Sequence, residues 1–376
     1  MRLLSLEVQN YRNIASASLT PGRELTVICG NNGQGKTNLL EAIWLLTGGK
    51  SFRGGKDAEL VRRGEPFAVL EASTIRAQQE EQETETPNHV RLTVGTPESP
   101  RPGRNASVNG APPKRASALA GSFPAVVFDP GHLSLVKGAP EGRRKFLDAA
   151  LCQLYPGYLT VYRRYVRALK QKNALLRQSN MARALTVTEK AEKMAVLEVL
   201  NKELSIQGES IQRGRRAYLR ELIPLACSNY AELSHGAERM ELHYAAQFEP
   251  GGLADLLRAR QSEELRVGQS LCGPHREDME LLLDGQPAKV FASQGQQRSV
   301  VLSLKMAEAA AAAAITGEHP VLLLDDVLSE LDDGRKQYLL TRMREKQTFV
   351  TSCDDTAFLK TDGEVYRMNG GVLTKA

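Results

Sequence analysis

A glycine-rich segment near the N-terminus constrains the fold of this 376-residue chain more than any other feature. Residues 30–37 read Gly-Asn-Asn-Gly-Gln-Gly-Lys-Thr, which is the pattern G-x-x-x-x-G-K-[ST] of a phosphate-binding loop. An apolar run at 25–29 precedes it, and apolar residues at helical spacing follow it over 35–47. The order of strand, glycine loop and helix predicts an α/β protein.

The chemistry of this loop indicates ATP and Mg²⁺ as ligands. Its glycines let backbone N–H groups converge on phosphate oxygens, and the helix N-terminus adds partial positive charge. Lys36 would bridge the β- and γ-phosphates, and Thr37 would bind Mg²⁺. A glycine turn that only capped a helix would need no lysine there. The predicted ATP-binding residues of the loop are Gly30, Asn31, Asn32, Gly33, Gln34, Gly35, Lys36 and Thr37.

A second apolar run, 321–324, ends in the carboxylates Asp325 and Asp326. Asp325 would hold Mg²⁺ directly or through water. Asp326 would polarise the water that attacks the γ-phosphate, so it is the predicted catalytic residue. Paired aspartates also occur in strand-end turns and helix N-caps, but the phosphate loop in the same chain favours the metal and water roles.

A third motif, residues 293–296, stands where a helix over 295–315 is predicted to begin. A hydroxyl, a glycine and a helix N-terminus can form an anion site, although Ser293 could also be only an N-cap. The order and wide separation of the three motifs resemble the ABC/SMC class of ATPases. In that class, this signature motif faces the γ-phosphate bound by the other protomer. The matching residues here are Ser293, Gln294, Gly295 and Gln296.

The stretch after Asp326 resembles the D-loop, which crosses the dimer interface in that class; it comprises Ser329, Glu330, Leu331 and Asp332. No histidine stands at Thr351 or Ser352, where transporter ATPases carry a switch histidine, and Asp326 replaces the usual glutamate. Both departures argue against a transporter. Arg12 would contact the nucleotide, as matching residues do in SMC-like heads, or else form a surface salt bridge.

The whole chain resembles the RecF family of this class. The stretches that carry the resemblance are NYRN at 10–13, GNNGQGKTNLLEAIW at 30–44, VNG at 108–110, LVKGAPEGRRKFLD at 135–148, GPHRED at 273–278, FASQGQQRS at 291–299 and LLLDDVLSELD at 322–332. One departure is Asp-Pro-Gly-His at 129–132, where the family is expected to carry proline followed by acidic residues. No role is carried over to that loop.

The resemblance implies an ATP-dependent homodimer that binds duplex DNA near junctions with single strands, and a slow ATPase stimulated by DNA. It further implies RecO and RecR as partners in loading recombinase, and a cytoplasmic, nucleoid-associated protein. The alternative is an SMC-like structural or regulatory ATPase that acts on a protein partner, for which a long heptad arm would be the distinguishing feature.

The charge distribution points to a polyanion independently. The net charge is +5, yet residues 143–220 hold 17 lysines and arginines against 6 aspartates and glutamates, a local net of +11. A solvated helical surface would give the same count. The candidate DNA contacts, which would bind phosphate without reading sequence, are Arg143, Arg144, Arg163, Arg164 and Lys170.

Hydrophobic patterning divides the chain into three parts: an ATPase part at 1–140 with short alternating strands over 57–128, a helical insertion at 141–266, and a second ATPase part at 267–376. Within the insertion, apolar residues recur every seven positions from Leu197 to Leu225. The longest apolar run, 309–315, is too short for a bilayer, so no membrane role is expected. The predicted fold is an α/β P-loop ATPase head of the ABC/SMC type with peripheral antiparallel strands and an inserted helical lobe.

Overall fold

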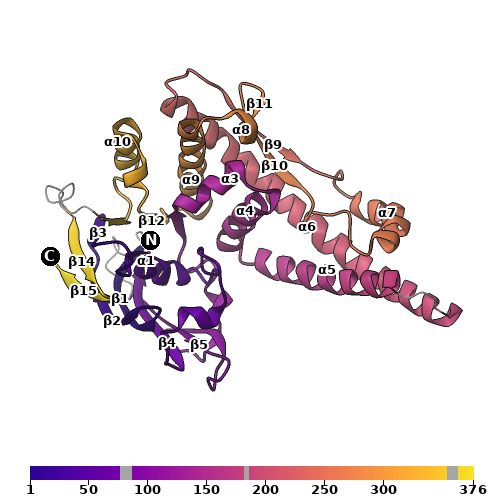
Figure 1. The fold of residues 1–376 in the computed structure, drawn as a ribbon, viewed down its shortest axis with the longest axis horizontal. Coiled ribbons are helices and arrows are strands. Elements are labelled where there is room, and N and C mark those ends of the chain that lie inside the picture. The colour runs from indigo at the N-terminus through magenta and orange to yellow at the C-terminus, as the bar shows by residue number, and fades with distance from the viewer. Residues whose placement is uncertain (77–86, 182–185, 354–362) are drawn as a thin grey trace. The chain divides into compact units, whose positions relative to one another are not determined.

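The computed structural model describes residues 1–76, 87–181, 186–353 and 363–376. These residues form two compact units (Figure 1). The first unit comprises 1–133, 232–235 and 298–376, and the second comprises 134–231 and 236–297.

A mixed six-stranded sheet carries the phosphate loop in the first unit. Its strand order is β15-β14-β3-β13-β12-β8, and every neighbouring pair is parallel except β14 with β15. The strand β13 lies between β3 and β12, so the carboxyl ends of β3 and β12 meet at one edge of the sheet, one strand apart. The bounds are β3 Leu25–Cys29, β8 Ala125–Phe128, β12 Val321–Asp325, β13 Thr348–Ser352, β14 Glu364–Asn369 and β15 Val372–Lys375.

This sheet separates two hydrophobic cores, because successive side chains of a strand point to opposite faces. Ile28 and Leu323 belong to the core that includes helix α1 (Lys36–Leu45). Val27 and Leu322 belong to the other core, to which helices α9 (Gln294–Thr316) and α10 (Asp333–Arg342) contribute. Strands covered on both faces read as continuous apolar runs, which explains the sequence pattern at 25–29 and 321–325.

A second six-stranded sheet, antiparallel throughout, shares the α1 core, as predicted for the peripheral strands. Its members are β1 Arg2–Tyr11, β2 Ile14–Leu19, β4 Phe67–Ile75, β5 Asn88–Gly95, β6 Gly103–Val108 and β7 Lys114–Arg115. The polar segment at 78–88, whose composition is typical of an exposed hairpin tip, lies mostly outside the described residues. Four short 3-10 helices complete the described part of this unit: η1 Asp57–Leu60, η2 Ala116–Leu119, η3 Pro130–Leu133 and η4 Leu328–Glu330.

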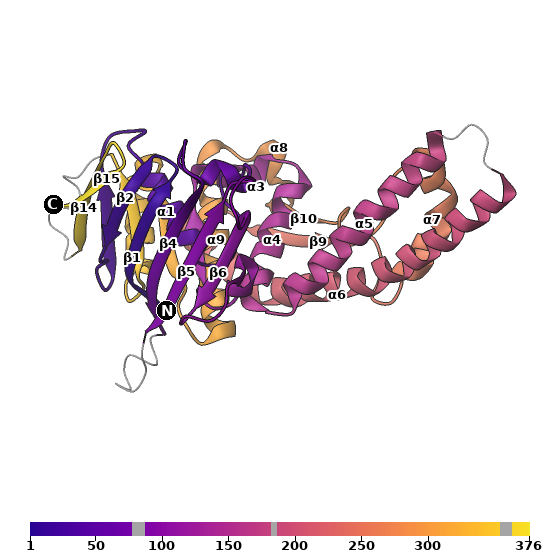
Figure 2. The ribbon, with the colours of Figure 1, turned by 90° about the horizontal axis from the view of Figure 1, so that it is seen from below.

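The second unit is mainly helical, and Figure 2 shows α5, α6 and α7 as its elongated part. Leu197, Leu204, Ile211 and Tyr218 are each no more than 2% exposed, which confirms the predicted seven-residue seam as far as Tyr218, whereas Leu225, its last predicted member, is half-buried. The bounds are α3 Ser134–Lys137, α4 Pro140–Leu154, α5 Tyr158–Met181, α6 Val187–Leu233, α7 Leu253–Val267, α8 Ala288–Phe291, β9 Met240–Ala245, β10 Asp278–Leu283 and β11 Gln286–Pro287.

The structure corrects the predicted organisation after residue 230. The insertion was expected to be nearly free of strands, but β9 pairs with β10 in a three-stranded sheet of order β11-β10-β9. Because this pairing ties 278–283 to the helical part, the second unit continues to residue 297. The boundary predicted at 266/267 therefore differs from the observed one, whereas the boundary predicted at 140/141 lies close to the observed one at 133/134.

Helix α9 is long and apolar enough to cross a membrane by length and composition, although the apolar run inside it is short. Its most apolar window is 67% buried within the protein. Leu302, Met306 and Ala309 lie in the core on one face of the mixed sheet. The apolar character of α9 therefore serves the packing of this core.

Candidate nucleotide-binding site

The phosphate loop joins β3 to α1 and depends on glycine at both of its ends. Gly30 and Gly35 have φ angles of 151° and 114°, which favour glycine. A Cβ atom at Gly30 would lie 2.3 Å from the carbonyl oxygen of Met368, and one at Gly35 would lie 2.7 Å from Oδ1 of Asn13. Both conformation and crowding therefore exclude larger side chains at these positions.

Lys36 begins α1, and its side chain turns back over the loop. It is only 6% exposed. Its Nζ donates to the carbonyl oxygens of Gly30 and Asn31, the latter at 3.0 Å, and lies 3.5 Å from Sγ of Cys353. The ammonium group thus sits among neutral acceptors at the loop, where it can exchange these weak partners for phosphate oxygens.

Three oxygen-bearing side chains converge where β12 and β13 end. Thr37 Oγ1 donates to Oδ1 of Asp325 at 2.8 Å, and Thr351 Oγ1 donates to the same atom at 2.9 Å. Burial raises the pKa of Asp325 above its usual value, and the neighbouring charges of Asp129 and Asp326 act in the same direction. A hydroxyl and a carboxylate in contact are the oxygen ligands that Mg²⁺ prefers, so the residues present fit this ion.

Asp326 follows β12 in a left-handed conformation, with a φ of 50°. Such a conformation is rare for a residue other than glycine and is maintained only by surrounding contacts. Here the Asp326 N–H donates to Thr351 Oγ1 at 2.9 Å, and Ser329 Oγ donates to the Asp326 carbonyl oxygen at 2.7 Å. Thr351 therefore binds both aspartates, and the D-loop serine supports the predicted catalytic residue.

The other predicted D-loop residues make separate contacts. Glu330 lies 3.8 Å from Arg298, and Leu331 packs in the core with α9. Asp332 accepts from the N–H of Arg335 at 2.9 Å and caps α10. A role for these residues at a dimer interface stays a prediction.

Arg12 forms an ion pair with Glu41, which lies on α1 and is completely buried. Tyr11 Oη and Ser51 Oγ donate to the same carboxylate. Although burial would raise the pKa of Glu41, the hydrogen bonds from Arg12, Ser51 and Tyr11 lower it. Arg12 thus forms an ion pair with a buried partner rather than a surface salt bridge. Its contact with a nucleotide stays a prediction.

The signature residues belong to the second unit, at the start of α9. Ser293 N donates to Gln296 Oε1 at 2.6 Å, and Gln296 N–H donates to Ser293 Oγ at 3.2 Å. This reciprocal pair is a capping box. Gln296 also donates from Nε2 to Glu238, and Gln294 is exposed. The N-cap interpretation of Ser293 is confirmed, and a role of 293–296 toward a nucleotide stays a prediction.

The structure separates the predicted DNA contacts into two groups. Arg143 is buried and forms two hydrogen bonds with Asp278, at 2.8 and 2.7 Å, while Arg144 is half-buried and donates to the carbonyl oxygen of Glu277 at 2.7 Å. Because the Arg143 guanidinium group is buried and paired with Asp278 inside the second unit, its assignment to DNA is corrected to a structural role, whereas a DNA contact of Arg144 stays a prediction. Arg163, Arg164 and Lys170, on α5, are exposed.

The GPHRED stretch at 273–278 makes structural contacts inside the second unit. Glu277 is 1% exposed and accepts from Gln212 Nε2 at 2.8 Å and from Tyr244 Oη. Burial lowers the pKa of His275 to about 4, with the charge of Arg276 acting in the same direction.

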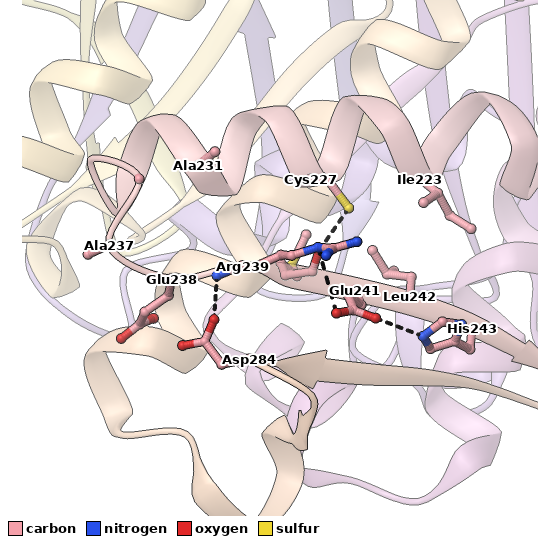
Figure 3. Close-up of a pocket in the computed structure, with 12 residues that line it drawn as sticks. Ile223, Cys227, Ala231, Ala237, Glu238, Arg239, Glu241, Leu242, His243 and Asp284 are labelled. Atoms are coloured by element: carbon pink, nitrogen blue, oxygen red, sulfur yellow. Dashed lines mark hydrogen bonds and ion pairs between the residues drawn. The ribbon is translucent and has the colours of Figure 1, made fainter.

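A hollow of about 630 Å³ lies in the second unit between α6 and β9 (Figure 3). Cys227 Sγ donates to the carbonyl oxygen of Met240 at 3.1 Å, and Arg239 and His243 both lie beside Glu241. None of the predicted site residues lines it.

Sequence reasoning missed the groups that surround the phosphate loop. Glu41 and Asn13 lie in stretches that carry the family resemblance, but neither had a predicted role at the loop. The Asn-Gly pair at 369–370 indicates a hairpin turn but not its contact with the loop, and Thr351 was noted only for the histidine that it replaces. The NYRN stretch was the one available signal for Asn13. Contacts among segments this distant in sequence require the fold.

The phosphate loop on β3, the aspartates on β12 and the inserted helical unit together define an ATPase head of the ABC/SMC class. The sequence profile described as "RecF/RecN/SMC N terminal domain" matches residues 2–371. The chain belongs to the RecF family.

The protein named "DNA replication and repair protein RecF" from Syntrophotalea carbinolica is 36% identical over 99% of both chains, and that from Heliobacterium modesticaldum is 36% identical over 100% of both. A solved structure of the recombination mediator protein RecF with ATP, in the RecFOR pathway, matches with a TM-score of 0.86 at 30% identity, covering 100% of this chain and 97% of the other. The Smc head domain from Pyrococcus furiosus, at a TM-score of 0.55 and 16% identity over 100% and 95% of the chains, shares the fold.

Proposed function

We propose that this chain is an ATP-driven, DNA-binding switch of recombinational repair. ATP closes a homodimer on duplex DNA near single-strand gaps, and hydrolysis opens it. The observation that carries this proposal is the convergence of Lys36, Thr37, Asp325 and Asp326 at one edge of the mixed sheet. The signature residues lie in the second unit, apart from this group. In the ABC/SMC class, the second protomer supplies them to the nucleotide.

Each converging group has a separate task. Lys36 neutralises charge on the β- and γ-phosphates, and the N–H groups of the loop bind their oxygens. Thr37 and Asp325 hold Mg²⁺, which supplies further neutralisation of phosphate charge when bound. Asp326 orients and polarises the attacking water, and Thr351 and Ser329 hold Asp326 in place. Because the signature residues must arrive from a second protomer, turnover is slow in dilute protein and rises with protein concentration.

Helix α5 carries the DNA contacts in this proposal. Arg163, Arg167, Lys170 and Arg177 are exposed and follow one another at spacings of four, three and seven residues, so they share one face of the helix, the basic face of α5. None of the four has an ion-pair partner among the residues that the structure describes. At about 1.5 Å per residue the basic face extends about 21 Å, a span along which duplex DNA offers many phosphates.

RecO and RecR are the protein partners in this proposal, and loading of recombinase is the shared task. The support is family membership, together with the RecFOR pathway named for the solved relative. A protein of this kind acts on the nucleoid in the cytoplasm.

Light scattering of the Asp326→Asn variant, which binds ATP without hydrolysing it, tests the proposal. We expect a monomer mass with no nucleotide or with ADP, a dimer mass with ATP, and a tighter dimer with duplex DNA. Lys36→Ala should stay monomeric under all conditions. A constant monomer of the Asp326→Asn variant with ATP and DNA would contradict the switch and leave Ser293 as a helix cap only.

A second candidate, an SMC-like ATPase that acts on a protein partner, is favoured by one observation on α6. Val196, Val199 and Ile206 are 50%, 69% and 52% exposed and fall at helical spacing. An exposed apolar stripe of this kind is typical of a protein contact. DNA affinity that is unchanged after the basic face of α5 is neutralised would favour this candidate.

A further inference from the structure

Two turns from opposite ends of the chain hold the phosphate loop from outside. The carbonyl oxygen of Gln34 accepts from Asn13 Nδ2 at 3.0 Å and from the N–H of Gly371 at 2.9 Å. The side chain of Gln34 accepts from the N–H of Gly370 at 2.6 Å. Asn13 lies between β1 and β2, and the glycines lie between β14 and β15. We call Asn13, Gly370 and Gly371 the loop clamp.

The loop clamp fixes the orientation of one peptide group. In a trans peptide the C=O and N–H point in opposite directions. Two donors hold the Gln34 carbonyl toward the clamp, so the N–H of Gly35 is turned to the other side, into the loop. An N–H in that position is one of those that bind phosphate.

The two sides of the clamp, Gly371 and Asn13, are themselves held in fixed positions. Gly371 has a φ of 85°, and a Cβ atom there would lie 2.3 Å from the carbonyl oxygen of Asn13. The amide of Asn13 is itself oriented, because its Oδ1 accepts from Asn38 Nδ2 at 2.7 Å. Asn38 belongs to α1, so the helix that begins at the loop also sets the direction of the Asn13 donor.

We propose that Asn13 and the turn at 370–371 are positioning residues for ATP binding: they hold the Gln34–Gly35 peptide in the orientation in which its N–H donates to a phosphate oxygen. This inference rests on the proposed function, in which the loop binds ATP. A loop with three glycines loses much conformational entropy when it is ordered, and the clamp removes part of that cost before the nucleotide arrives. The effect therefore falls on nucleotide affinity rather than on the hydrolytic step.

Asn13→Ala tests the clamp, because it removes one of the two donors to the Gln34 carbonyl. We expect the affinity for a fluorescent ADP analogue with Mg²⁺ to fall about tenfold, with kcat at saturating ATP within about twofold of wild type. The matched control is Asn109→Ala, which also removes one hydrogen bond between an asparagine side chain and the backbone: in another turn of the first unit, Asn109 Oδ1 accepts from the N–H of His89 at 2.8 Å. This control should lose similar thermal stability and keep wild-type affinity.

The outcomes separate the two proposals. A wild-type protein that does not bind the analogue overturns the proposed function, whereas a wild type that binds it and an Asn13→Ala variant of equal affinity overturn only the clamp. Should Asn13→Ala fail to fold, a pair of glycine variants decides. An alanine at 370 keeps the N–H that donates to Gln34 and has no atom within 4 Å of its Cβ position, whereas an alanine at 371 would crowd the Asn13 carbonyl oxygen, so Gly371→Ala should weaken binding far more than Gly370→Ala. Equal affinities for these two variants also overturn the clamp.

Discussion

Lys36 and Lys172 are both buried lysines, and the neighbours of their ammonium groups differ. In the first unit, Lys36 Nζ contacts two backbone carbonyls and the Cys353 thiol, none of which carries a formal negative charge. In the second unit, Lys172 Nζ lies 2.6 Å from Oε2 of Glu264, and both side chains are 0% exposed. The positive charge of Lys36 is left for a ligand, whereas that of Lys172 is neutralised by the fold.

Two further buried cations of the second unit are likewise neutralised by carboxylates. Arg143 pairs with Asp278, and Arg215 pairs with Asp148 at 2.9 Å through each of two nitrogens. Burial of a cation therefore does not by itself mark a functional site. A buried cation matched by a carboxylate stabilises packing, and one surrounded by neutral oxygens is ready to bind an anion.

The largest effect that this comparison predicts is on Lys172. Lys172→Met keeps the volume but leaves the Glu264 carboxylate buried without its cation, so we expect the free energy of unfolding to fall by about 3–5 kcal/mol in urea denaturation. Lys172→Met combined with Glu264→Gln should recover most of that loss, because the introduced amide oxygen would still accept from Ser270 Oγ and the Leu271 N–H. Lys170→Met, on the same helix and exposed, is the matched control. A loss below about 1 kcal/mol for Lys172→Met would argue that the ion pair is dispensable.

Lys36→Ala should show the opposite behaviour. Among the described residues around Lys36, the substitution leaves no carboxylate without its cation, so the melting temperature should change little. The affinity for an ATP analogue should fall at least about 100-fold, since the charge-assisted bonds to phosphate are lost. Fluorescence titration and thermal denaturation of the same sample measure the two effects. A variant that unfolds as readily as Lys172→Met would break the comparison.

The contrast also explains which parts were predictable from sequence. The strands at 25–29 and 321–325, the loop between strand and helix, and the placement of Lys36 at that loop and of Asp325 at the strand end follow from local patterns, because the chemistry of phosphate binding requires residues close together in the chain. Arg143 was misjudged because its partner, Asp278, lies 135 residues away. A count of charges in a segment cannot show which of them meet a carboxylate from elsewhere.

Strand β9 was missed for a related reason. It is an edge strand whose only strand neighbour in the described sheet, β10, follows more than thirty residues later. Its six residues lie between a long helix and a loop, so neither periodicity nor length distinguished them from the helical surroundings. Non-local pairing determined both this strand and the boundary of the second unit.

A third prediction concerns a neutral buried group of the second unit. His275 has a pKa of about 4 in the fold against 6.5 for the free side chain, so the unfolded chain takes up a proton at a pH where the native protein does not. The contribution of neutral His275 to the free energy of unfolding is complete above pH 6.5 and is lost as the pH falls toward 4. Between pH 7 and pH 5, the free energy of unfolding should therefore drop by about 2 kcal/mol. Urea unfolding at both pH values should show that His275→Gln reduces this drop. An unchanged pH dependence would mean that His275 titrates normally in the native protein.

The smallest predicted effect is on DNA binding by the basic face of α5, where the cations have no carboxylate partners among the described residues. Replacing Arg163, Arg167 and Lys170 together by glutamine should weaken duplex binding about tenfold at physiological salt and reduce the slope of log K against log salt by about 2 to 3. The free energy of unfolding should stay within about 0.5 kcal/mol, because exposed charges contribute little to stability. Arg143→Gln is the matched contrast: it should destabilise the fold through the unpaired Asp278 and leave the salt slope of the folded protein unchanged. A salt slope that fell for Arg143→Gln and not for the triple variant would contradict the division between cations that hold the fold and cations that bind a ligand in this unit. The phosphate contacts would then have to lie elsewhere on the chain.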